Sequence, residues 1–153
     1  MLSYAFTTLN QGGYEDIATE EFENMHNLFA AILAKGISRQ LKQGLYREYL
    51  NRKEDVADVR GKIDIPGTIQ NRLARKRVLT CEYDELSENN LLNQILKTTV
   101  MLLLRHTRVD QEYKSDLKKE MLFFSNVDTI DPTTIRWSAI RFQRNNNTYR
   151  MLI

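Results

Sequence analysis

The sequence predicts an α+β fold that is mainly helical, with a small antiparallel β lobe inserted between helices. Two long stretches carry apolar residues at every third or fourth position, which is typical of amphipathic helices, while the middle of the chain holds short strand-like segments. The length of 153 residues suits one domain with a core of its own. We therefore expect a single domain over residues 1–153, with the β lobe at about 45–84 and a helical base from residues 1–44 and 87–153.

Composition narrows the class of protein. Apolar residues make up 42% and charged residues 27% of the chain, which is typical of a globular protein and excludes a disordered tail. The lone Cys81 excludes a disulfide framework within the chain and a zinc site built from several cysteines. The longest apolar run, Val100–Leu104, is far too short to cross a membrane, and no signal peptide is visible. We expect a cytoplasmic protein with no membrane partner.

The first half of the helical base is a helix from about Glu20 to Gln43, which follows a short helix at Leu2–Leu9. Glutamates crowd its first turns, cations lie toward its end as the helix dipole favours, and Gly44 is a natural stop. Its apolar stripe consists of Phe22, Met25, Leu28, Phe29, Ile32, Leu33, Ile37 and Leu41.

The β lobe contains three predicted strands, Leu45–Leu50, Val59–Ile65 and Val78–Tyr83, which are rich in aromatic residues or alternate in polarity. In the second strand, Arg60 and Lys62 lie on the face opposite the apolar residues, so we expect both at the surface.

A short helix is predicted between the second and third strands. Pro66-Gly67 ends the strand, and Thr68 is positioned to cap a helix that carries Ile69 and Leu73.

The second half of the base begins near Ser87 and Asn90 with a helix whose apolar stripe is wide enough to lie at the centre of the core. Asp110 is expected to cap a third helix that ends at Phe123-Phe124. The core residues expected from the central helix are Leu92, Ile95, Leu96 and Leu103.

Two further signals lie near the C-terminal end. Asp131-Pro132 is typical of a helix start or a turn. Asn147-Thr148 predicts the start of another helix, which the last residue, Ile153, interrupts. We therefore expect the chain to be cut off inside an element that continues in a longer protein.

Charge is distributed in blocks, although 22 basic residues nearly balance 20 acidic ones. Residues 60–77 contain one acid, Asp64, and an acidic block without a base follows at residues 82–88. Such blocks suit a chain that docks on a partner, whereas the alternative is an ordinary solvated surface. The cations of the first block are Arg60, Lys62, Arg72, Arg75, Lys76 and Arg77.

The segment 71–77 is the strongest indication of nucleic-acid binding in the chain. Its cations would neutralise phosphates without specifying a sequence, and no aromatic residues lie among them to stack on bases. The alternative is a solvated helix end whose cations complement the helix dipole.

Catalytic chemistry is hard to find in the sequence. Neither a phosphate-binding loop nor a dinucleotide fingerprint occurs, and the two histidines, His26 and His106, lie on different helices. Cys81 alternates with apolar residues and is expected to be a packed strand thiol. Asp116 and Lys118 match the end of a metal-dependent nuclease motif, but metal nucleases need acids that converge on Mg²⁺, and this pair lies mid-helix. We expect no catalytic residue, metal, cofactor or small-molecule ligand.

An ordered set of motifs resembles the McrC family. In sequence order they are VRGKIDIP at residues 59–66, NRLARKR at 71–77, CEYDELSENN at 81–90 and LNQILK at 92–97. The opening MLSYAF at residues 1–6 is similar to the first helix of that family, and NNNTY at 145–149 is similar to its lead-in to the next helix. The order and spacing match, and the resemblance covers essentially the whole chain.

The resemblance implies a function. McrC proteins are the nuclease subunits of McrBC-type restriction systems, and their partner McrB is a hexameric AAA+ GTPase that recognises methylated DNA. The family's N-terminal half binds the GTPase ring and stimulates hydrolysis, while the C-terminal half carries the PD-(D/E)xK nuclease. This chain resembles the N-terminal half alone, so the resemblance implies a non-catalytic docking module that meets DNA within the full complex.

Two alternatives from other classes remain at this point. One is a free-standing DNA-binding protein that uses Arg72–Arg77, and the other is a minimal nuclease that uses Asp116 and Lys118. Salt-dependent DNA binding without a partner would favour the first. Mg²⁺-dependent cleavage that is lost on Asp116→Ala would favour the second.

Overall fold

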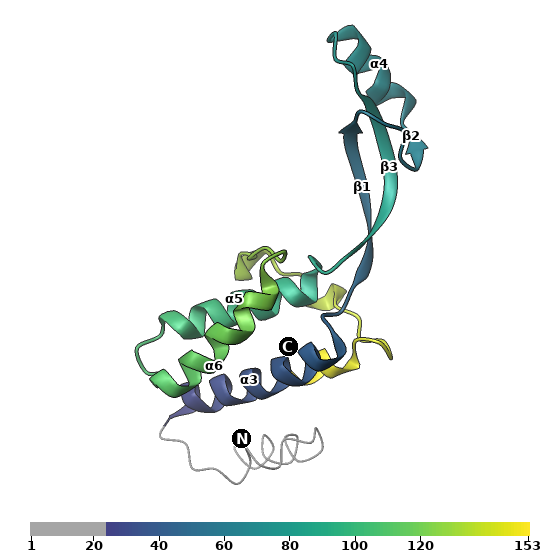
Figure 1. Ribbon diagram of the computed structural model, residues 1–153. Coiled ribbons are helices and arrows are strands. Elements are labelled where there is room, and N and C mark those ends of the chain that lie inside the picture. The colour runs from purple at the N-terminus through teal and green to yellow at the C-terminus, as the bar shows by residue number, and fades with distance from the viewer. Residues whose placement is uncertain (1–23) are drawn as a thin grey trace. The chain divides into compact units, whose positions relative to one another are not determined.

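The computed structural model describes residues 24–153, and these residues divide into two compact units (Figure 1). The helical unit comprises residues 24–46 and 91–153, and the inserted unit comprises residues 47–90. Helices predominate and the strands form one antiparallel sheet, which confirms the predicted α+β class. The helix predicted at Leu2–Leu9 and the predicted start of the next helix at Glu20 lie outside the described residues.

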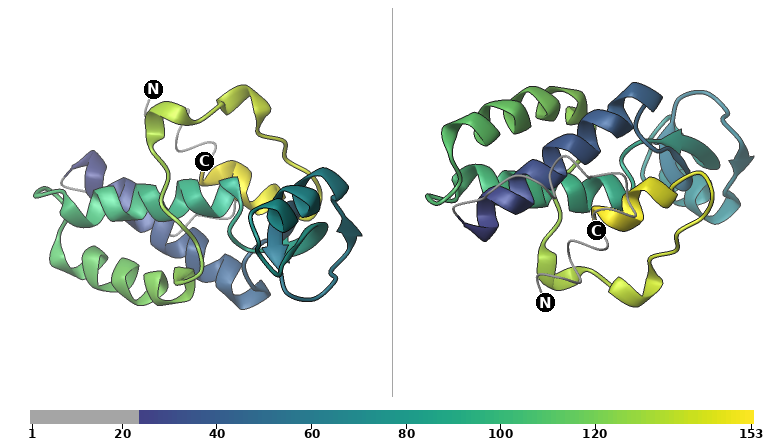
Figure 2. Two further views of the ribbon diagram at one scale, coloured as in Figure 1. Left: turned by 90° about the horizontal axis from the view of Figure 1, so that it is seen from above. Right: turned by 90° about the horizontal axis from the view of Figure 1, so that it is seen from below.

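The helical unit is built from three α-helices, α3 (Met25–Gln43), α5 (Leu91–Arg105) and α6 (Gln111–Met121). Four short 3-10 helices follow: η1 (Leu122–Phe124), η2 (Pro132–Thr134), η3 (Trp137–Ala139) and η4 (Asn147–Met151). The segment after η1 loops outward and returns, so that η4 lies beside the long helices (Figure 2). None of the helices that the structure describes is both long and apolar enough to span a bilayer.

Side-chain caps fix several of these helix ends. Asn24 accepts hydrogen bonds from the backbone N–H groups of His26 and Asn27 at the start of α3. Asp110 precedes α6 as predicted, but its carboxylate accepts a hydrogen bond of 2.7 Å from Asn27 Nδ2 instead of capping the helix backbone. Asp131 caps η2 as the sequence predicts, through the Thr133 N–H group. The helix predicted from Asn147 is the 3-10 helix η4.

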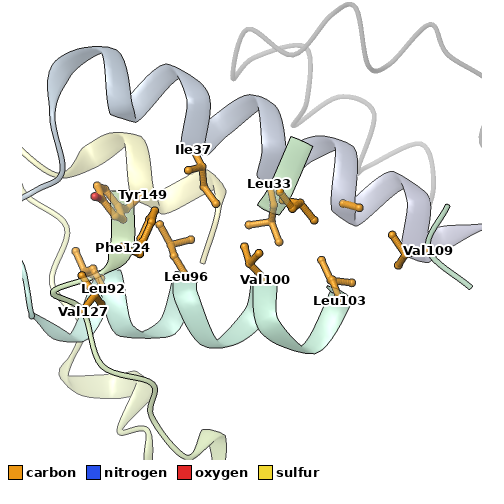
Figure 3. Packing of buried hydrophobic residues seen from close by; sticks show 12 residues of the cluster. Leu33, Ile37, Leu92, Leu96, Val100, Leu103, Val109, Phe124, Val127 and Tyr149 are labelled. Carbon is orange, nitrogen blue, oxygen red and sulfur yellow. The ribbon is translucent and has the colours of Figure 1, made fainter. Parts of the chain in front are cut away.

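The core of the helical unit lies between α3 and α5 (Figure 3). Leu33 and Ile37 of α3 face the apolar side of α5. All four residues predicted for the core of the central helix are buried: Leu92, Ile95, Leu96 and Leu103. The stripe predicted on α3 is buried only in part, because Met25 and Phe29 are about half exposed. The predicted apolar stripe therefore extends further around α3 than the side of the helix that is buried.

A buried hydrogen-bond network joins three distant parts of the helical unit. The Tyr149 hydroxyl donates to Asn93 Oδ1 at 2.7 Å and accepts from the Tyr46 N–H group at 3.1 Å. Asn93 Nδ2 in turn donates to the Tyr46 carbonyl at 2.9 Å. Tyr149 is fully buried, and this burial raises the pKa of its hydroxyl to about 12. Since Tyr46 ends one part of the unit and Asn93 lies at the start of the other, the network fixes both points at which the chain leaves and re-enters this unit.

The inserted unit is a three-stranded sheet that carries one helix. Its elements are β1 (Glu48–Val56), β2 (Lys62–Ile63), α4 (Ile65–Leu73) and β3 (Leu79–Ser87), and the strand order is β1-β3-β2. Glu48 pairs with Ser87, and Val56 pairs with Leu79. The first and last strands therefore form a ribbon about 25 Å long, and everything between Val56 and Leu79 belongs to the end of the ribbon away from residues 48 and 87.

The second predicted strand is wrong for most of its length. Only Lys62 and Ile63 pair with β3, and Val59 and Ile65 are both 62% exposed. Gly61 has a φ of 68°, and a Cβ there would collide with Tyr83 and the Glu82 carbonyl, so the chain bends sharply against β3 before β2 begins.

The start of the following helix also differs from the prediction. Pro66 does not end a strand but lies in the first turn of α4, where the missing N–H group is tolerated. Asp64, not Thr68, is the cap, because its carboxylate accepts the Gly67 N–H group at 3.0 Å. The helix consequently begins three residues before Thr68.

Glu120 is a buried acid on α6. Its side chain is 9% exposed, and its Oε2 atom has no hydrogen-bond partner among the described residues. Burial, with a smaller contribution from Asp116, raises its pKa from 4.5 to about 8. Between these two pH values the unfolded chain releases this proton while the folded chain keeps it, so Glu120 lowers stability increasingly as pH rises from 4.5 to 8.

Glu120→Gln should therefore stabilise the chain at neutral pH. Its advantage in the free energy of unfolding over the parent should grow by roughly 2–4 kcal/mol between pH 4.5 and pH 8. Urea unfolding at several pH values measures this difference. Glu112→Gln, at an exposed position of the same helix, should show no such trend. An advantage of Glu120→Gln that does not change with pH would contradict the raised pKa.

Candidate functional site

The candidate site is the segment made of α4 and the loop after it, because four of the six cations predicted to contact a partner lie on that segment. Arg72 belongs to the last turn of α4, whereas Arg75, Lys76 and Arg77 follow the helix before β3 begins. All four are exposed. The structure thus brings these cations together on one short segment.

A polar network attaches α4 to the sheet. Asn71 is 7% exposed, and its Nδ2 atom donates to Asp55 Oδ1 at 2.7 Å and to Thr80 Oγ1 at 3.0 Å. The Thr80 hydroxyl donates to the same Asp55 oxygen at 2.7 Å. These hydrogen bonds from Thr80 and Asn71 lower the pKa of Asp55, so the carboxylate stays ionised and the network stays intact at neutral pH.

A second contact fixes the start of α4. Lys53 of β1 forms an ion pair of 2.9 Å with Asp64, the residue that caps the helix. The hydrogen bonds from Lys53 and from the Gly67 N–H group lower the pKa of Asp64. An open groove of about 510 Å³ lies along these residues. Three of its four charged groups, Lys53, Asp55 and Asp64, are bonded to other residues of its lining, and the fourth, Glu54, accepts a hydrogen bond from the Tyr83 hydroxyl. We therefore interpret the groove as part of the attachment of α4.

The chain leaves α4 through a left-handed residue that is not glycine. The Lys76 N–H group bonds the Asn71 carbonyl at 2.8 Å and the Arg75 N–H group bonds the Arg72 carbonyl at 3.0 Å, which is the Schellman arrangement. Arg75 occupies its left-handed position with a φ of 58°. Glycine is the usual residue there because a Cβ makes this conformation unfavourable. An exposed arginine is thus held at a position where it costs stability.

The two remaining predicted cations lie against other groups of the unit, although neither forms an ion pair among the described residues. The Arg60 guanidinium lies over the Tyr83 ring, 4.3 Å from its centroid. Lys62 pairs with Glu82 across the β2–β3 ladder, and its charge contributes to the lowered pKa of Asp64. Arg72, Arg75 and Arg77 likewise form no ion pair with any acid between residues 24 and 153.

The acidic block at residues 82–88 is explained by the strand register. Cross-strand ion pairs join Arg47 to Glu88 at 3.8 Å, Arg52 to Glu85 at 3.2 Å and Lys53 to Glu82 at 3.8 Å. The sequence alone did not indicate these pairs, because the cations lie more than 25 positions earlier in the chain. Within the described inserted unit, the basic segment 72–77 is therefore the charge block that internal ion pairs leave unexplained.

The residues considered for catalysis lie apart from this segment. Asp116 and Lys118 are exposed on α6, and Asp116 pairs with Lys119 at 3.2 Å. His26 and His106 stack on each other in the helical unit with ring centroids 3.9 Å apart. Cys81 is fully buried, which confirms the packed thiol. Over residues 24–153, no three His, Cys, Asp or Glu side chains gather in a way that could hold a metal ion.

Comparisons with known proteins cover the whole chain. The family model described as McrBC 5-methylcytosine restriction system component matches residues 1–153. The chain is 22% identical over 153 residues to the type IV methyl-directed restriction enzyme EcoKMcrBC of Escherichia coli (strain K12), and the match covers 100% of this chain and 44% of that protein.

Two solved structures share the fold. The cryo-EM structure of the Thermococcus gammatolerans McrBC complex matches with a TM-score of 0.72 and 25% identity, over 97% of this chain and 48% of the other. A half-complex from the tetradecameric assembly of Thermococcus gammatolerans McrB AAA+ hexamers with bound McrC matches with a TM-score of 0.72 and 24% identity, over 97% and 38%. The chain thus spans about half the length of these relatives or less.

Arg75→Gly should stabilise the chain slightly, because it removes the unfavourable left-handed arginine. We expect a gain of about 0.5–1 kcal/mol in the free energy of unfolding. Arg72→Gly makes the same substitution inside α4 and should cost about 1 kcal/mol. Chemical denaturation of the two variants measures both values. Equal losses in the two variants would contradict the strain at Arg75.

Proposed function

The chain belongs to the family of McrBC 5-methylcytosine restriction system components, and on that premise we propose that it is the partner-binding part of a McrC-type subunit. It docks on a McrB-type AAA+ GTPase ring and stimulates GTP hydrolysis in modification-dependent DNA restriction. The chain itself is the non-catalytic part of that subunit, and it forms one partner-binding domain that precedes a nuclease domain. DNA is contacted within the full complex.

The observation that carries this proposal is the exposed basic segment at the end of the inserted unit. Three arginines without an ion pair among the described residues lie within six positions of each other, on a segment that a buried polar network holds to the sheet. Cations in this setting suit acidic residues of a protein partner. Charge pairs of this kind fix orientation and association rate more than affinity. The match to a McrBC complex supports a McrB-type partner.

A second function is favoured by the same segment. From Ile65 to Cys81 the sequence has no acid, so residues 72–77 would also neutralise the phosphates of DNA. DNA binding by the chain alone would then weaken steeply as salt rises. The docking function is preferred because the two arginines and lysine beyond α4 have no aromatic neighbours in sequence for stacking on bases.

The combined variant Arg72→Ala, Arg75→Ala and Arg77→Ala tests the docking function. With the cognate McrB-type subunit, it should stimulate GTP hydrolysis several-fold less than the parent, and the loss should be largest at low salt because salt screens charge pairs. The chain alone should neither hydrolyse GTP nor cut DNA.

Three exposed cations of the helical unit provide a control with the same change in charge: Arg105→Ala, Lys118→Ala and Arg144→Ala. This control should stimulate as the parent does. A folded arginine variant that stimulates as well as the parent at low and moderate salt excludes the basic segment as the docking element. A DNA mobility shift by the parent alone that the arginine variant loses supports the second function instead.

A further inference from the structure

Helix α4 exposes its apolar side. Ile65, Ile69 and Leu73 are spaced by four residues and therefore share one face of the helix. Their exposed fractions are 62%, 53% and 81%. Single exposed aliphatic residues are common on protein surfaces, but a continuous stripe along a whole helix is not.

The inward side of α4 is polar. Asn71 is the buried residue of this helix, and it bonds to Asp55 and Thr80 of the two long strands. Thr68 Oγ1 accepts a hydrogen bond from the Thr80 N–H group at 3.1 Å. An ordinary surface helix buries its apolar stripe and exposes its polar side. The polarity of α4 is reversed, so its apolar stripe is left for another molecule.

The charge next to this stripe identifies the kind of molecule. One cation, Arg72, directly precedes Leu73, and three more follow it at residues 75–77. No acid occurs between Asp64 and Glu82. A second copy of the chain would bring two such cation clusters together, which is unfavourable. DNA would use the cations but would leave the aliphatic stripe in water. A protein groove that is apolar inside and acidic at its rim satisfies both features.

We propose that α4 is a docking helix. Ile65, Ile69 and Leu73 enter an apolar groove on the partner, and the cations of residues 72–77 pair with carboxylates at the rim of that groove. This is the helix-in-groove mode of recognition, with anchors on successive turns of the helix. The inference rests on the proposed function, since the partner is the AAA+ GTPase subunit, and it adds that apolar contacts, not charge alone, hold the complex together.

The test compares two double variants in the complete chain. Ile69→Ser with Leu73→Ser removes two anchors, and Leu102→Ser with Leu122→Ser removes two leucines of the helical unit with nearly the same exposure, 54% and 77%. Affinity for the cognate GTPase subunit, loaded with a non-hydrolysable GTP analogue, is measured by calorimetry together with stimulated GTP hydrolysis.

We expect the α4 variant to bind at least tenfold more weakly at every salt concentration and the control to bind within twofold of the parent. Both should unfold at the parent's temperature, because the substituted side chains are exposed. Leu73→Gln alone, at the most exposed position, keeps a good helix former and should show a smaller loss in the same direction.

The outcomes separate the two proposals. If the parent binds and stimulates and the α4 variant does so equally well, the docking helix is wrong while the proposed function stands. If the parent neither binds nor stimulates, the proposed function fails and the docking helix fails with it. The parent is also tested for self-association and for binding to vesicles that contain phosphatidylserine. If it shows either behaviour and the α4 variant loses that behaviour, then α4 contacts a second copy or a membrane, and the proposed protein groove is wrong.

Discussion

The buried hydroxyl of Tyr149 is the contact on which the organisation of the chain depends. It bonds to Asn93 and Tyr46, which lie at the two points where the chain re-enters and leaves the helical unit. The 44 residues inserted between α3 and α5 form a long excursion of the chain, and bringing its two ends together costs conformational entropy. Both junctions are held by hydrogen bonds beside the packed core of α3, α5 and η4, within the helical unit itself.

The inserted unit keeps its own two ends together by strand pairing instead of by buried hydrogen bonds. Its strands begin and end as paired neighbours, and the β1–β3 ladder together with the polar network under α4 holds the unit together. A buried asparagine is favourable only while its hydrogen bonds are made, so this network holds α4 in one position on the sheet. The apolar residues of α4 are not needed for that attachment. They are available for a partner, which links the local packing of this helix to the proposed docking function.

The periodicity of the sequence predicted the fold class and the central helix, because Leu92, Leu96 and their neighbours follow a single helical stripe. It also predicted the β lobe and its short helix, but it misplaced element bounds in this insertion, where contacts between residues distant in sequence determine which segments pair. Residues 59–65 alternate like a strand, yet the bend at Gly61 and the cap at Asp64 limit the strand to two residues. The basic segment was visible as a charge run, whereas the reversed polarity of α4 depends on Asn71 facing Asp55 and Thr80, which no local pattern reveals.

Hydrogen–deuterium exchange of the chain, alone and with the cognate McrB-type GTPase, tests the central claim most directly, namely that the end of the inserted unit is the docking surface. The account predicts that amides of residues 65–77 become slower to exchange in the complex, while those of helix α6 (Gln111–Met121) in the helical unit keep their rates. Protection confined to the helical unit, with residues 65–77 unchanged in a complex that forms, would contradict it.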